Sequence, residues 1–226
     1  MKRLLMAVTT VVLLTGLGVG VAGAQPASTA TPMPMGPETD RAYVEFTFGP
    51  TFGHKASASF GAEGGYWFGD FLGVFVEGGR MSDVATSEIE AKAQTIAGSF
   101  GATTTSKQPA NYFDGGVAVR MLTSGRFTPY ALVGFGAARV SNNVSFFVNG
   151  TDVTGHVDQF GVTLAGDLSG NYTKAFITFG VGTHVALARR WIADVSYRYG
   201  SIGKHSDAEL SAISTNRLQF AIGAKF

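Results

Sequence analysis

Apolar and polar side chains alternate along most of the chain from residue 41 to its end. Successive side chains of a β-strand point to opposite faces of a sheet, whereas a helix repeats its apolar positions every three or four residues. A period of two, such as Val44 and Phe46 on either side of Glu45, therefore predicts strands. The pattern recurs in residues 41–49, 59–68, 71–77, 113–121, 174–187, 191–199 and 217–226. Residues 129–140 are also predicted to form a strand, but they are apolar on both faces, so their orientation is ambiguous, and Ala131, Val133 and Phe135 are the preferred outward set.

Three features distinguish these strands from those of a soluble β-sandwich, which also alternate. Charged side chains occupy the middle of the polar face, where the core of a soluble protein would bury them at high cost. The apolar face carries aromatic side chains towards the ends of the segments, as a membrane interface requires. These interfacial aromatic residues are Tyr66, Phe68, Trp191, Tyr197, Tyr199 and Phe226.

The third feature is the length of the connections. Tight connections at residues 69–70, 123–126 and 188–190 contrast with long ones at residues 81–110 and 141–172. Transmembrane barrels have short periplasmic turns and long extracellular loops. We therefore predict an all-β fold, an eight-stranded antiparallel up-and-down transmembrane β-barrel over residues 41–226, and we expect a monomer. A soluble β-sandwich is the alternative.

The two long connections differ in composition. Residues 81–110 are rich in Ala, Ser, Thr and Gly and show a helical pattern at residues 88–94. Residues 141–172 contain an apolar stretch from Val144 to Val148. This stretch could meet a partner, but we favour a continuation of the barrel strands beyond the membrane, because neighbouring strands often extend outward together.

Composition adds further constraints. The chain contains 31 glycines, and glycine inside strands permits the strong coiling that a narrow barrel needs. Its 17 basic and 16 acidic residues nearly cancel, so no net field attracts nucleic acid. The absence of cysteine excludes a disulfide scaffold and thiolate metal sites. We expect no cofactor and no bound nucleic acid.

The first 40 residues follow a different pattern. Lys2 and Arg3 precede an apolar run, which ends at the small residues Ala22-Gly23-Ala24. This order is typical of a secretory signal peptide over residues 1–24, although the apolar run is also about long enough for a retained membrane anchor. Residues 25–40 are rich in Pro and Thr, which predicts an extended linker.

Charged residues on the polar strand faces would point into the barrel. Eight strands leave an interior that side chains fill, so we predict a balanced network of five acidic and five basic residues that plugs the lumen. The alternative is a narrow polar conduit whose charges set ion preference. The predicted network, with an inward histidine included, consists of Glu45, Glu63, Glu77, Asp114, Arg120, Lys174, His184, Asp194, Arg198, Arg217 and Lys225.

Catalytic chemistry has little support in the sequence. His205 and Ser206 are residue types of a lipid hydrolase, but adjacent residues of a strand point to opposite faces and cannot share a site. Asp152, Asp158 and Asp167 do not follow the spacing of a calcium loop. We therefore predict neither enzymatic activity nor a metal site.

The chain resembles the OmpA-like eight-stranded outer-membrane β-barrels, which include small bacterial surface antigens. The resemblance rests on Pro129-Tyr130, which opens a strand leading to Gly134-Phe135-Gly136, on the strand end at residues 196–200, and on the terminal Phe226. It implies a protein of the Gram-negative outer membrane, in contact with outer-membrane lipids and of structural or surface-antigen type.

The same resemblance implies an assembly signal, through which the barrel-assembly machinery recognises the last strand. Gln219, Ala224 and Phe226 fit this signal, whereas Ala221 stands where such signals carry glycine. By analogy with the family, loops 81–110 and 141–172 could bind a host or surface ligand, so a loop-mediated adhesin is one alternative function. A porin-like channel for small solutes is the other.

Overall fold

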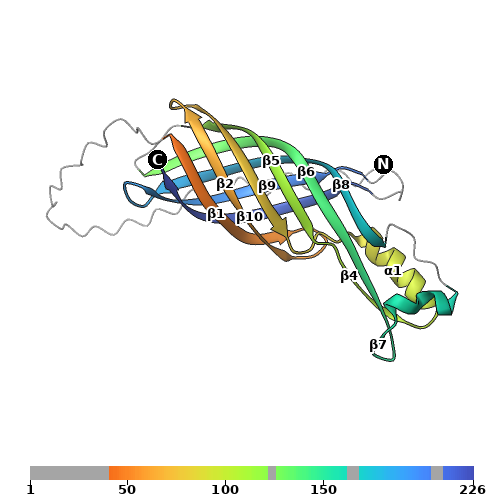
Figure 1. Ribbon diagram of the computed structural model, residues 1–226. Helices are drawn as coiled ribbons and strands as arrows, with labels where there is room; N and C mark the ends of the chain where they lie inside the picture. Colours follow the sequence, from red (N-terminus) through yellow and green to blue (C-terminus); the bar gives the residue numbers. More distant parts are fainter. Residues whose placement is uncertain (1–40, 122–125, 162–167, 205–210) are drawn as a thin grey trace, which may run out of the picture. The chain divides into compact units, whose positions relative to one another are not determined.

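Figure 1 shows the computed structural model, which describes residues 41–121, 126–161, 168–204 and 211–226. The predicted signal peptide and linker lie outside the described residues. So do most of the tight turn at residues 123–126, and also Asp167, His205 and Ser206.

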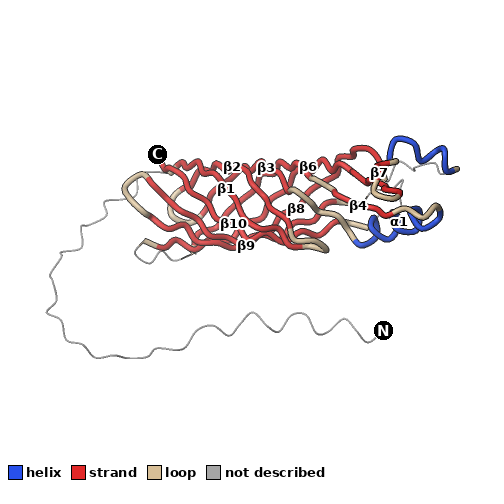
Figure 2. Tube along the Cα trace, turned by 90° about the horizontal axis from the view of Figure 1, so that it is seen from below, coloured by secondary structure: helices blue, strands red, loops and turns tan. Residues whose placement is uncertain are grey.

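Eight long antiparallel strands form a closed barrel (Figures 1 and 2). Neighbouring strands pair around the ring, and the pairing of β1 with β10 leaves the ring without a free edge, as a lipid environment requires. The predicted eight-stranded barrel is confirmed, and each predicted segment corresponds to one strand. The strands are β1 (Ala42–Phe52), β2 (Ser57–Phe68), β3 (Leu72–Met81), β5 (Ala110–Arg120), β6 (Phe127–Val148), β8 (Ser169–Ala186), β9 (Trp191–Ile202) and β10 (Ile213–Lys225).

The register of the strands determines their tilt. A row of directly paired residues that starts at Thr173 on β8 runs once around the barrel and returns to β8 at Thr183, a shift of ten residues. Closure with such a stagger requires strands inclined by about 35–45° to the barrel axis. Eight strands at this tilt enclose an interior that is just wide enough for side chains.

Glycine permits close approach of neighbouring strands within the barrel wall. A Cβ atom at Gly116 would lie 1.9 Å from the carbonyl oxygen of Val133, and one at Gly136 would lie 2.0 Å from that of Phe113. Any side chain at these positions would push neighbouring backbones apart. Part of the glycine excess is therefore a steric requirement of the narrow barrel.

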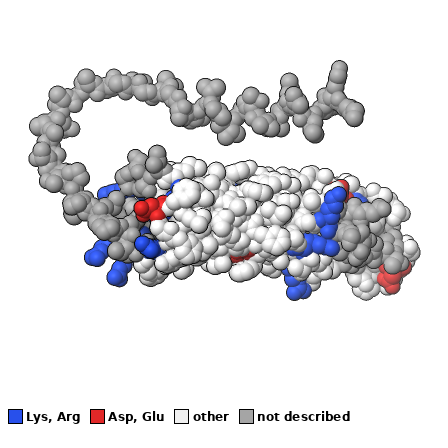
Figure 3. Space-filling model, turned by 90° about the horizontal axis from the view of Figure 1, so that it is seen from above, with Lys and Arg blue, Asp and Glu red and all other residues white. Residues whose placement is uncertain are grey.

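The outward-facing side chains are apolar over most of the barrel. Phe46, Phe135 and Val181 are each more than half exposed, and the middle of the face in Figure 3 carries almost no charge. Soluble monomers rarely expose apolar patches of this extent, so the surface fits contact with lipid.

Two strands continue beyond the barrel and carry a small cap, seen at the right of Figures 1 and 2. β6 and β8 remain paired as far as Asn143 and Ser169, and β6 itself continues to Val148, so the apolar stretch extends a barrel strand as predicted. Added to this extension are β4 (Thr103–Lys107) and β7 (Thr151–Asp152), which pair with β6, together with α1 (Ser87–Ser99) and the 3-10 helix η1 (Thr154–Phe160).

The helical pattern at residues 88–94 predicted the helix α1. The Thr86 side chain caps it by accepting a hydrogen bond from the Ile89 amide at 3.5 Å. Among the described residues, no helix has the length and apolarity needed to cross a membrane. The helix instead packs its apolar face into a cluster of the cap, which contains Ile89, Ala93, Ala97, Val144, Phe146, Val157 and Leu168.

Polar contacts attach α1 to the rim of the barrel. Glu90 forms an ion pair with Lys55, and its Oε2 lies 2.6 Å from Nε2 of His54. Both partners lie in the connection between β1 and β2, which spans only residues 53–56, so not every outer loop is long. The bond from the Lys55 ammonium, with the contribution of His54, holds the pKa of the Glu90 carboxyl below its usual range.

This contact predicts that the cap loosens in acid. Because the pKa of Glu90 is lower in the docked state, the contact stabilises docking above the usual glutamate pKa and is lost as the pH falls through the lowered value. The Glu90→Gln protein lacks the carboxylate at every pH, so at pH 7 it should behave like the unmodified protein in acid. Hydrogen-exchange protection of its α1 amides should be lower by about two- to fivefold.

Asp158→Asn is the matched control, since it removes one exposed carboxylate of the cap that has no partner among the described residues. Its α1 amides should keep the protection of the unmodified protein. If the α1 amides of the Glu90→Gln protein at pH 7 were as protected from hydrogen exchange as those of the unmodified protein, the proposed attachment would be contradicted.

Candidate functional site

Four acidic side chains form one row across the inner wall of the barrel. The register places Glu45 opposite Glu63, Glu63 opposite Glu77 and Glu77 opposite Asp114, on β1, β2, β3 and β5. None of the four is more than 2% exposed. Like charges that lie directly opposite on neighbouring strands destabilise a sheet, so this row requires cations from elsewhere in the barrel.

Two arginines on the other side of the ring pair with the middle two residues of the row, Glu63 and Glu77. Arg198 on β9 lies directly opposite Arg217 on β10, and both guanidinium groups are fully buried. Arg198 Nη1 donates to Glu77 Oε2 at 2.8 Å, and its Nη2 lies 2.5 Å from Glu63 Oε2. Arg217 Nη1 donates to Glu77 Oε1 at 3.1 Å. Glu77 is therefore the centre of the network.

Neutral donors complete the hydrogen bonding of the two glutamates. The Tyr112 hydroxyl and the Gln219 amide donate to Glu77 Oε1 at 2.7 and 2.8 Å, and the Tyr43 hydroxyl donates to Glu63 Oε1 at 2.7 Å. Such bonds to buried carboxylates are the strong, charge-assisted kind. Neither tyrosine was among the predicted network residues: alternation places both on the inward face, two residues from Glu45 and Asp114, but does not identify their partners.

The structure distributes the lumen charges less evenly than expected. Five carboxyl groups are buried in the lumen, the four of the acidic row and that of Asp194, whereas only two basic side chains are buried with them. The other three predicted basic residues are half-buried: Lys174 lies on the loop side of the network, and Arg120 and Lys225 line the turn end. The expected balance of five and five thus does not exist at the centre, because inward positions are spread along the barrel axis.

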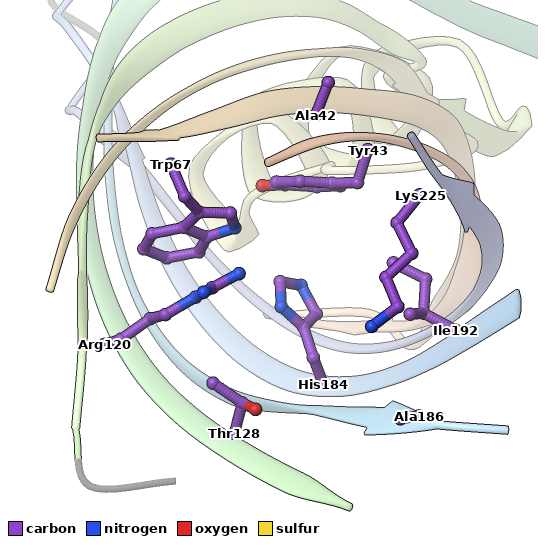
Figure 4. A pocket seen from close by; sticks show the side chains of 9 residues that line it. All are labelled: Ala42, Tyr43, Trp67, Arg120, Thr128, His184, Ala186, Ile192 and Lys225. Atoms are coloured by element: carbon purple, nitrogen blue, oxygen red, sulfur yellow. The ribbon is translucent and has the colours of Figure 1, made fainter. Parts of the chain in front are cut away.

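Aromatic side chains fill the turn end of the lumen (Figure 4). The ring of His184 lies 4.7 Å from that of Tyr130, 5.1 Å from that of Tyr43 and 6.2 Å from that of Trp67. The guanidinium of Arg120 lies over Trp67, 4.0 Å from the ring centre. The cavity among these groups measures about 30 Å³, which is room for little more than a water molecule.

Apolar side chains fill the loop end. Met81, Phe176 and Ile202 are fully buried and, with Ile213, belong to one cluster above the ion network. The lumen therefore consists of three layers in sequence: an aromatic layer, an ionic layer and an apolar layer. Within the described part of the chain, no group of three or more His, Asp or Glu side chains is arranged to hold a metal ion.

The predicted interfacial aromatic residues all have exposed side chains. Near the turn end lie Tyr66, Phe68, Trp191 and Phe226. Tyr197 and Tyr199 lie closer to the loop end, where the Tyr197 hydroxyl donates to Asn216 Oδ1 at 2.6 Å. An apolar ring with a bonded hydroxyl suits a membrane interface.

The residues of the predicted assembly signal occupy different environments on β10. Gln219 points inward to Glu77, as described above, whereas Phe226 is exposed on the outer surface. Ala224 lies opposite Val44 of β1, and the Phe226 amide donates to the Ala42 carbonyl at 2.8 Å. The end of β10 thus completes the seam that closes the barrel.

Comparison with protein families shows that the family of the outer membrane protein beta-barrel domain matches residues 11–226 of the chain. No curated protein matches the sequence significantly.

Solved structures similar to this chain include three bacterial barrels. The attachment invasion locus protein Ail of Yersinia pestis is 13% identical with a TM-score of 0.47, over 83% of this chain and 99% of that one. Neisserial surface protein A is 15% identical with a TM-score of 0.48, over 82% and 96%. The N-terminal barrel domain of OprF from Pseudomonas aeruginosa is 12% identical with a TM-score of 0.48, over 83% and 98%.

The central position of Glu77 predicts a large loss of stability when its charge is removed. Replacing Glu77→Gln should lower the free energy of unfolding by about 3–5 kcal/mol, because two buried guanidinium groups lose their shared counter-charge. Urea-induced unfolding of the protein in lipid vesicles, followed by heat-modifiable gel mobility, measures this change.

Asp70→Asn is the matched control, since it removes a carboxylate in the exposed turn between β2 and β3. Its unfolding free energy should stay within about 0.5 kcal/mol of that of the unmodified protein. A similarly small change in the Glu77→Gln protein would show that the network does not depend on Glu77.

Proposed function

The chain belongs to the family of outer membrane protein beta-barrel domains, and on that basis we propose that it is a closed membrane anchor of structural or surface-antigen type. The observation that carries this proposal is the layered lumen, with Glu77, Arg198 and Arg217 fully buried at its centre. A structural role needs a stable closed barrel, whereas a channel needs a continuous polar path.

Two physical barriers oppose conduction of ions and solutes. A permeating ion would have to separate Glu77 from its arginines, and breaking a buried pair costs several kcal/mol. It would then have to cross the apolar layer around Met81 and Phe176, and apolar constrictions block ions by excluding water. The narrow polar conduit is therefore the weaker alternative.

The proposal includes the route of the protein to the membrane. Residues 1–24 would act as a signal peptide that is removed after Ala24, and residues 25–40 would connect it to the barrel. The barrel-assembly machinery would recognise the last strand through Gln219, Ala224 and Phe226. The bond from Gln219 to Glu77 already explains the presence of a glutamine at this position. Phe226, which is exposed at the end of the chain, is therefore the stronger candidate for recognition.

The cap supports a second candidate function, adhesion through the outer loops. The described parts of residues 81–110 and 141–172 form a folded unit with its own apolar cluster, which a loop that merely connects two strands does not need. At its surface Phe160 is exposed and stacks on Phe100, with ring centres 5.1 Å apart. A folded cap of this kind could present a fixed surface to a host or surface ligand.

The closed lumen predicts an electrically silent protein. In planar lipid bilayers the folded protein should give no sustained channels at neutral pH, under conditions in which a large open porin conducts. Folding in the same preparation is checked by heat-modifiable mobility, so silence cannot result from unfolded protein. Sustained and well-defined open channels would contradict the proposal.

The cap predicts that membrane insertion and surface binding can be separated. Replacing residues 87–107 and 149–168 by short turns removes α1, β4, β7 and η1 but leaves the lumen contacts in place. The shortened protein should keep its heat-modifiable mobility. If the unmodified protein binds cells or matrix, binding should disappear; persistent binding, or none before shortening, would eliminate the adhesin function.

A further inference from the structure

Charge is distributed very unequally between the two faces of the barrel wall. All five acidic residues of the eight barrel strands are buried on the inner face. The described barrel strands carry only two charged residues on their outer face, Arg80 on β3 and Arg139 on β6, and both side chains are exposed. The outer wall is therefore apolar apart from its polar residues, and the only charges that its described strands carry are the positive charges of these two arginines.

The two arginines belong to one polar row. Arg80 lies directly opposite Asn111 on β5, and Asn111 lies directly opposite Arg139. Neighbouring strands are about 4.8 Å apart, so the two arginine Cα atoms lie about 10 Å from each other with the asparagine amide between them. Neither arginine forms a hydrogen bond or an ion pair with another described residue.

The row lies at the outer edge of the apolar band. A tilted strand rises about 2.5 Å per residue along the barrel axis. Leu72 and Phe127 begin β3 and β6 at the turn end of the barrel. Arg80 therefore lies roughly 20 Å above Leu72, and Arg139 lies roughly 30 Å above Phe127. The apolar band of an outer-membrane barrel is about 25 Å tall. Below Arg139 the exposed Phe135 is apolar, whereas Ser141 beyond it is polar.

We propose that Arg80, Asn111 and Arg139 form a binding site for a phosphate group of lipid A in the outer leaflet. In a Gram-negative outer membrane this leaflet consists of lipopolysaccharide, whose phosphates lie at the outer boundary of the acyl chains. Guanidinium groups match phosphate oxygens with paired hydrogen bonds, and the asparagine amide supplies a further donor between them. This site depends on the membrane location of the barrel and is independent of whether the lumen is closed.

An alternative without a ligand is that both arginines extend their charged groups into water. That arrangement does not explain why the two charges share one row with a polar residue between them. It also predicts no preference for phosphate, which makes the two interpretations distinguishable.

The test is a titration of the full-length folded protein in detergent with purified diphosphoryl lipid A, followed by native mass spectrometry. The Arg80→Gln/Arg139→Gln protein should bind at least about tenfold more weakly. The control protein, Arg189→Gln/Arg190→Gln, has the same change in net charge at two exposed arginines of the turn end and should bind like the unmodified protein. Heat-modifiable mobility verifies that all three proteins are folded.

Dephosphorylated lipid A separates the phosphate from the acyl chains. It should bind the unmodified protein as weakly as diphosphoryl lipid A binds the Arg80→Gln/Arg139→Gln protein. The proposal is overturned if removal of phosphate has no effect, if both double variants lose affinity equally, or if inorganic phosphate competes as strongly as lipid A. The first result would mean that lipid A binds through its acyl chains, and the second that any positive charge attracts it. The third would mean that the site binds free phosphate.

Discussion

The interior of this barrel depends on one electrostatic constraint: the two glutamates in the middle of a buried acidic row must share two arginines from across the lumen. Glu77 lies in the middle of that row and receives both arginines, a tyrosine and a glutamine. Because the partners come from β5, β9 and β10, the network ties together strands on different sides of the ring. The same contacts that stabilise the closed sheet therefore also fill the space through which a solute would pass.

The rest of the barrel is arranged around this ionic layer. Aromatic side chains around His184 close the turn end, and the apolar cluster around Phe176 closes the loop end, so the ion pairs are kept from water and their mutual attraction is strengthened. The outer wall has the opposite chemistry, apolar over the band that lipid covers and cationic at its outer edge. All five acidic side chains of the barrel strands point inward, together with the arginines that pair with them, whereas the two charged side chains on the outer face are both arginines.

Much of this organisation could be predicted from local pattern. Alternation identified the eight strands and the inward or outward direction of residues such as Glu63 and Trp191, because side-chain direction in a strand depends only on position. The helical pattern identified α1, although β4 and β7 were missed, since strands of five and two residues carry little periodic signal. The tyrosines that bond the glutamates were missed because alternation gives the face of a residue but not its partner.

The sequence by itself determined the fold class, the two faces of every strand except the one at residues 129–140, which is apolar on both faces, and the excess of small residues that a narrow barrel needs. Only the tertiary structure decided which inward charges meet. A register shift moves a residue along the barrel axis, so Lys174 and Arg120 point inward like Arg198 yet lie far from the acidic row. The same non-local register placed Arg80 and Arg139 in one outward row, although α1, β4 and β5 separate them in the chain. Direction is a local property of the backbone, whereas proximity depends on the stagger with which the sheet closes.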